Sequence, residues 1–95
     1  MEYNIRLSTK ATHYIEDIVK YLAQSWSEKV KTDFLVTLSE KLMLLETNPF
    51  IYRKSISKPN LRECIVNKNV VMYYAVDEVE REVVVLTLRN TKQIF

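Results

Sequence analysis

The sequence predicts an α+β fold in which an N-terminal strand is followed by an antiparallel helical hairpin and then by a three-stranded antiparallel meander. The second half of the chain contains three short runs rich in Val, Ile and Tyr, which are separated by polar turns. The first half contains two amphipathic helical patterns. Because such a sheet needs cover on one face, we expect the hairpin to lie across it. A chain of 95 residues suits a single domain, 1–95.

The chain opens with a strand pattern that passes directly into a helical one. Tyr3, Ile5 and Leu7 alternate with polar residues, which is the period of a half-buried strand. Ser8 stands where a helix N-cap belongs. The helix is expected to run from Thr9 to about Gln24, because apolar residues then recur at intervals of three and four. These residues are Ala11, Tyr14 or Ile15, Ile18 and Leu22.

A second helical pattern follows almost at once. Ser25 and Glu28 have the spacing of a capping box, so the helix is expected to begin at this junction. Asn48 and Pro49 end it, because the residue before a proline avoids helical angles. A connection this short predicts that the two helices are antiparallel. The apolar stripe of the second helix consists of Val30, Phe34, Leu38, Leu42 and Leu45.

The meander is predicted to consist of strands at Leu61–Val66, Val70–Val76 and Val83–Leu88, with turns at 67–69 and 77–81. A basic loop from Phe50 to Asn60 precedes it. Glycine is absent from the chain, which excludes Gly-rich phosphate loops and dinucleotide fingerprints. Asparagine is the expected substitute where φ is positive, and the Asn residues at or beside turns are Asn48, Asn60, Asn67, Asn69 and Asn90. The sequence does not determine which strand of the sheet pairs with the first strand.

Composition favours a cytoplasmic protein. Cys64 is the single cysteine, so an internal disulfide is excluded and a reducing compartment is expected. The N-terminus has no signal-peptide pattern, and no apolar run is long enough to span a membrane. The net charge of +2 is uneven, because residues 1–50 carry −1 and residues 51–95 carry +3. The basic half could meet nucleic acid or an acidic protein surface, or its loop could simply be solvated.

Few residues point to catalysis. His13, the single histidine, has no apparent acid–base partner, so a structural or surface role is expected. One His and one Cys fall short of a zinc site, and neither a metal nor another cofactor is predicted. Tyr73 and Tyr74 are adjacent and should face opposite sides of the sheet. Trp26, between the two helices, either caps the helical core or is an exposed aromatic anchor for a partner.

Four stretches, taken in order, resemble the RelE/ParE superfamily, the toxin halves of bacterial type II toxin–antitoxin modules. They are the early helix with Ile15–Leu22, the second helix running into Leu45–Pro49, the Leu61-Arg62-Glu63 start of a strand, and Val71–Val76 followed by Val83–Leu88. The likeness covers nearly the whole chain. It implies a cognate antitoxin as partner, with a hetero-oligomer as the possible assembly.

The resemblance implies two candidate mechanisms. RelE-like members resemble metal-independent ribonucleases that cut messenger RNA in the ribosome, and ParE-like members bind DNA gyrase. The nuclease branch places an Arg on its third strand, where this chain has Val71. The residues left as catalytic candidates are Arg62, Tyr74 (or Tyr73), Arg89 and Lys92.

This reduced set favours a ParE-like toxin that acts by binding. Its predicted partner-binding residues are Trp26, Arg53, Lys54, Lys58 and Arg62, because the basic members suit an acidic antitoxin tail. The alternatives are a RelE-like ribonuclease with a reduced site and an inactive relative retained for partner binding.

Overall fold

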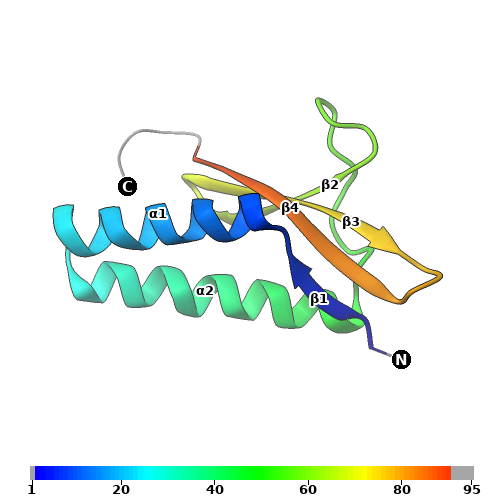
Figure 1. Cartoon of the computed structure of the whole chain (residues 1–95), viewed down its shortest axis with the longest axis horizontal. Helices are drawn as coiled ribbons and strands as arrows, with labels where there is room; N and C mark the ends of the chain where they lie inside the picture. Colours follow the sequence, from blue (N-terminus) through cyan, green and yellow to red (C-terminus); the bar gives the residue numbers. More distant parts are fainter. Residues whose placement is uncertain (1, 91–95) are drawn as a thin grey trace.

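The computed structural model describes residues 2–90. Its elements are β1 (Asn4–Leu7), α1 (Thr9–Ser25), α2 (Glu28–Thr47), β2 (Arg62–Asn67), β3 (Val70–Asp77) and β4 (Glu82–Asn90). The strands form a sheet in the order β1-β4-β3-β2, and the two helices lie side by side and antiparallel against one face of it (Figure 1). The predicted α+β class and order of elements are confirmed.

β1 lies at one edge of the sheet and pairs in parallel with β4, from Asn4 opposite Glu82 to Leu7 opposite Val85. Parallel neighbours need a long crossover, and the hairpin together with the meander provides it. β1 reaches only the first half of β4. Within the described part of the chain, residues 86–90 therefore have no strand on that side, and they lie beside α1.

Ser8 links the sheet to the first helix. Its hydroxyl accepts a hydrogen bond from the Ala11 amide, which is the predicted N-cap, and donates one to the Leu86 carbonyl at 2.7 Å. One side chain therefore satisfies an unpaired donor at the helix start and an acceptor on β4.

The predicted capping box at Ser25 and Glu28 is wrong. Ser25 is the last residue of α1, and Trp26 is its C-cap. Ser27 caps α2 instead, because its backbone is extended and its hydroxyl accepts a hydrogen bond from the Val30 amide at 3.1 Å. The residue three places after Ser27 is Val30, so a reciprocal carboxylate is not available. The second helix still begins where its apolar pattern predicts.

The expectation that Asn would supply positive φ is also wrong. Within residues 2–90, Arg81 is the residue with positive φ, at 54°, and its guanidinium lies 4.3 Å from the centre of the Tyr3 ring. Asn67 acts through its side chain, whose oxygen accepts hydrogen bonds from the Asn69 and Val70 amides. Asp77 does the same for the amides at 79 and 80. Such side-chain turns need no positive φ at the Asn or Asp itself.

A bulge in β4 determines which residues face each side of the sheet. Tyr74 pairs with Val85 and Tyr73 pairs with Thr87, so the register passes over Leu86. The buried inner residues therefore change from odd numbers, Val83 and Val85, to an even one, Leu88. Without this extra residue Arg89 would point toward the helices. With it, Thr87 and Arg89 share the outer face with Tyr73.

The core lies between the helices and the inner face of the sheet. It joins buried apolar residues of both helices to those of all four strands or their flanks. The members are Tyr3, Ala11, Ile18, Leu22, Phe34, Leu38, Leu45, Cys64, Val66, Val70, Met72, Tyr74, Val83, Val85 and Leu88. The predicted helical stripes supply the helical part of this set.

Candidate functional site

The adjacent residues Tyr73 and Tyr74 have separate environments on the two faces of β3. Tyr74 belongs to the inner core, and its hydroxyl donates to the Pro49 carbonyl at 2.8 Å. Burial is the main cause that raises the pKa of Tyr74 to about 12. Tyr73 lies on the outer face and is also buried, with 1% exposure, but its hydroxyl has no hydrogen-bond partner. Tyr74 is thus a core residue, and Tyr73 is the tyrosine of the outer face.

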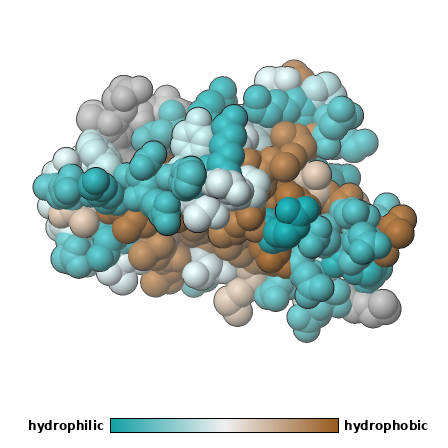
Figure 2. Space-filling model, viewed as in Figure 1, coloured by the Kyte–Doolittle hydropathy of each residue, from teal (hydrophilic) through white to brown (hydrophobic). Residues whose placement is uncertain are grey.

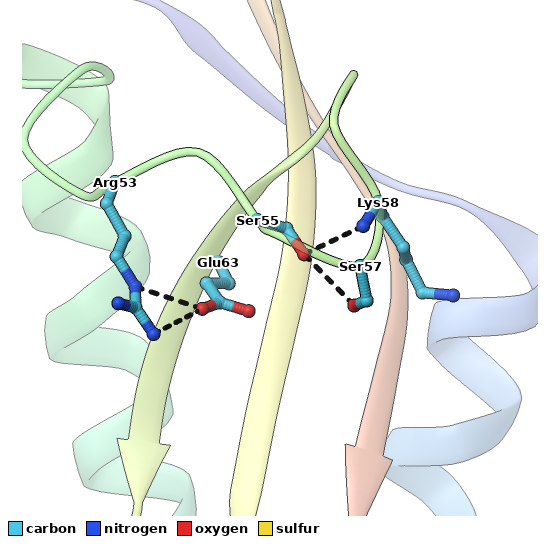
Figure 3. Close-up of polar contacts among 5 residues, drawn as sticks. All are labelled: Arg53, Ser55, Ser57, Lys58 and Glu63. Carbon is cyan, nitrogen blue, oxygen red and sulfur yellow. Dashed lines mark hydrogen bonds and ion pairs between the residues drawn. The ribbon is translucent and has the colours of Figure 1, made fainter.

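Two cations cover Tyr73. The ammonium of Lys58 lies 5.5 Å from the centre of its ring, and the guanidinium of Arg89 lies 5.9 Å from it. Lys58 comes from the loop that crosses the outer face, and Figure 3 shows its side chain pointing past β3 toward β4 and α1. Lys10 of α1 lines the same hollow as Lys58 and Arg89. The outer face therefore has a cationic surface over a buried phenol.

The loop that carries Lys58 is held in place by polar contacts (Figure 3). Arg53 donates to one oxygen of Glu63 through Nε at 3.1 Å and contacts it through Nη2 at 2.9 Å. Ser55 is buried, accepts from the Lys58 amide at 3.1 Å, and shares a hydrogen bond with Ser57. These contacts position the loop over β3.

Arg62 points to the inner side of the sheet, like Cys64 two residues later. Its Nη1 donates to the Tyr52 carbonyl at 2.8 Å, and its guanidinium lies 4.9 Å from the centre of the Phe50 ring. Both contacts tie the segment after α2 to the sheet. Cys64 is fully buried among the core residues, and this burial raises the pKa of its thiol.

Trp26 lies at the turn of the hairpin with 47% of its surface exposed, and its indole N–H donates to the Tyr21 hydroxyl at 3.2 Å. Figure 2 shows a band of hydrophobic surface across the middle of the face seen in Figure 1, bordered by hydrophilic surface. The exposed large hydrophobic residues of the hairpin are Tyr14, Trp26, Leu35, Val36, Met43 and Leu44. The hairpin therefore exposes several large apolar side chains, most of them on α2.

The remaining candidates lie elsewhere. Lys54 is exposed, and its backbone forms an isolated bridge with Arg62. His13 is exposed on α1. Lys92 lies outside the described residues. Within residues 2–90, no group of His, Cys, Asp and Glu is placed to hold a metal ion.

The predicted residues do not form one site. Lys58 and Arg89 meet at Tyr73 on the outer face, whereas Arg62 and Tyr74 meet on the inner face. Trp26 is the C-cap of α1, and the turn between the two helices lies at the opposite end of the hairpin from the segment that follows α2 (Figure 1).

Sequence reasoning missed Lys10, Ser55 and Glu63. The alternation of the β2–β3 hairpin offered a signal for Glu63, which pairs with Tyr73 and shares its face. For Lys10 no such signal existed, because its position depends on where β1 joins the sheet.

The chemistry available on the outer face is mainly that of binding anions. Three cations converge there, while Glu63 is held by Arg53 and the Tyr73 hydroxyl is buried. A general acid or base has to reach the proton that it transfers. In this conformation neither group is presented to a substrate.

The fold is that of known toxin–antitoxin proteins. The chain superposes on a structure of the chromosomal ParDE toxin–antitoxin system from P. aeruginosa with a TM-score of 0.79 and 11% identity, over 96% of this chain and 98% of that one. It superposes on a structure of the RelBE2 toxin–antitoxin complex of Mycobacterium tuberculosis with a TM-score of 0.66 and 13% identity, over 95% and 99%. For the RelE–RelB complex of Pyrococcus horikoshii the TM-score is 0.65 and the identity 14%, over 99% and 100%. The chain thus has the fold of the RelE/ParE superfamily, as predicted.

The family itself follows from a match in sequence. Residues 5–95 match the family model described as the ParE toxin of the type II toxin–antitoxin system parDE. The chain therefore belongs to the ParE toxin family. No match was found among curated proteins. Within residues 2–90, neither helix is long and apolar enough to cross a membrane.

Proposed function

We propose that this ParE-family chain inhibits growth in the cytoplasm by binding DNA gyrase, and that a cognate antitoxin neutralises it. The observation that supports action by binding is the state of the outer face, where Glu63 is paired with Arg53 and the Tyr73 hydroxyl is buried under two cations. General acid–base catalysis needs such groups within reach of a substrate. Binding needs only a complementary surface.

For the antitoxin we propose an acidic segment that adds a strand to β2. β2 is the edge of the sheet opposite β1. Arg53 and Lys54 lie beside the start of the free edge of β2, where the Glu63 amide donates to the Arg53 carbonyl. Within the described residues no strand pairs with 64–67 on that side, and Ile65 is 60% exposed. An edge with a neighbouring basic loop suits an acidic segment that folds as it binds.

The edge can be tested with two matched substitutions of exposed apolar residues. Ile65→Lys on β2 should weaken binding of the product of the neighbouring antitoxin gene by about tenfold or more, because it places a charge in the strand interface. Val79→Lys changes a residue that is 89% exposed in the β3–β4 turn, and it should have little effect. Titration calorimetry measures both. Equal affinities for the two variants would contradict the proposed edge, and no binding by the unaltered chain would contradict the partner.

A second candidate function, RelE-like cleavage of messenger RNA, is favoured by one observation. The cations around Tyr73 are of the kind that stabilises the charge of a phosphorane. A ribosome-programmed cleavage assay tests it. Cleaved message that is lost in Arg89→Ala would support a nuclease. Intact message together with unaffected growth would support an inactive partner-binding relative.

A further inference from the structure

A hollow of about 350 Å³ lies where the second half of β4 meets α1 and the outer-face loop. The hollow is lined by residues of four segments. They are Lys10 of α1, Lys58 of the loop, Tyr73 of β3, and Thr87 and Arg89 of β4. The β4 bulge and the short β1 together create this hollow. The bulge turns Arg89 outward, and β1 ends before it would cover residues 86–90.

The hollow is cationic and uncompensated. No Asp or Glu is among the described residues that line it. The ion pairs within residues 2–90 involve other cations, namely Arg6, Lys29, Lys31 and Arg53. Three like charges gathered from three separate elements repel one another, and an anion between them would remove that repulsion.

Two further observations indicate a ligand. The hydroxyl of Tyr73 is buried without a hydrogen-bond partner, and burying such a group unpaired is costly. In addition, α1 begins beside the hollow with Lys10 in its first turn and no acidic residue there. The positive end of a helix favours an anion, and Lys10 adds to this positive potential. Both features are unfavourable in the free protein.

We propose that this hollow binds a phosphate group. A carboxylate carries one charge on two oxygens and is satisfied by a single Arg. A phosphate offers more oxygens and up to two charges, which suits three cations approaching from separate elements. The site does not depend on the proposed antitoxin edge, because the residues that form it are not those of β2.

Amide chemical shifts of the purified chain, titrated with inorganic phosphate and separately with a short single-stranded DNA, test the site. Both should perturb Lys10, Lys58, Thr87 and Arg89, and they should compete. Phosphate bound alone would assign the site to a small phosphorylated ligand, and tighter DNA binding would assign it to a nucleic-acid backbone. Either result supports the proposal. A poly-glutamate peptide that binds these residues more tightly than both would overturn it, and so would the absence of shifts at these residues.

Matched variants locate the site. Lys10 is exposed, so Lys10→Gln should fold normally and bind phosphate about tenfold more weakly. Lys20→Gln removes the same charge from an exposed position further along α1 and should change affinity less than about twofold. Equal losses in Lys10→Gln and Lys20→Gln would show a diffuse charge effect and overturn the site.

Discussion

At the scale of single residues, Tyr73 and Tyr74 offer a comparison within one dipeptide. Both side chains are buried, but the hydroxyl of Tyr74 donates to Pro49 and that of Tyr73 has no partner. Tyr74→Phe should lower the free energy of unfolding by about 1 kcal/mol, because a buried acceptor loses its donor. Tyr73→Phe should leave it unchanged or raise it by about 1 kcal/mol, because a buried hydroxyl without a partner is removed. Urea denaturation measures both, and a larger loss for Tyr73→Phe would contradict the assignment of the two faces.

The pKa of Tyr74 predicts how stability depends on pH. Burial is the main cause that raises the pKa from 10.0 to about 12, so the folded chain disfavours the phenolate. Since the folded-state pKa lies above the unfolded one, this contribution is fully present below about pH 10 and is lost as the pH rises toward about 12. Tyr52, whose pKa burial likewise raises to about 12, acts in the same direction.

The ultraviolet absorbance of tyrosinate measures this ionisation. The unaltered chain should show a component that titrates near pH 12, and the double variant Tyr52→Phe/Tyr74→Phe should lack it. The variant should also lose less of its thermal stability between about pH 9 and pH 11. An unchanged titration curve would show that neither phenol is shielded from water.

At the scale of the elements, the start of α2 gives a test with an internal control. Ser27 caps the helix through the Val30 amide, whereas Ser25 is exposed at the end of α1. Ser27→Ala should cost about 1 kcal/mol of unfolding free energy. Ser25→Ala should change it by less than about 0.5 kcal/mol. A cost at Ser25 as large as that at Ser27 would restore the capping box that the sequence suggests.

The sequence predicts these elements closely because the signals for them are local. The apolar stripes, the Ser8 cap and the Asn48-Pro49 stop depend on neighbouring residues, and the helices and strands begin and end within about two residues of expectation. The β4 bulge was missed for a physical reason. Val83–Leu88 is almost uniformly apolar and does not alternate between polar and apolar residues. The sequence therefore gives no sign of the change of face at Leu86.

At the scale of the whole molecule, the candidate site depends on contacts between segments far apart in the chain. Lys10 reaches the hollow near Arg89 only because β1 pairs in parallel with β4 and leaves its second half open. No local pattern contains that pairing. The individual cations Lys58 and Arg89 were predicted, but their meeting over Tyr73 was not, because it requires the fold of the loop.

The proposal that the whole molecule acts on gyrase is tested most directly by DNA supercoiling with purified gyrase and increasing amounts of this chain. We predict that supercoiling falls with dose, that broken DNA accumulates, and that the purified antitoxin restores activity. Full supercoiling at every dose, with cleaved messenger RNA in a parallel ribosome reaction, would contradict the proposed mechanism and would indicate that the cations around Tyr73 serve a nuclease.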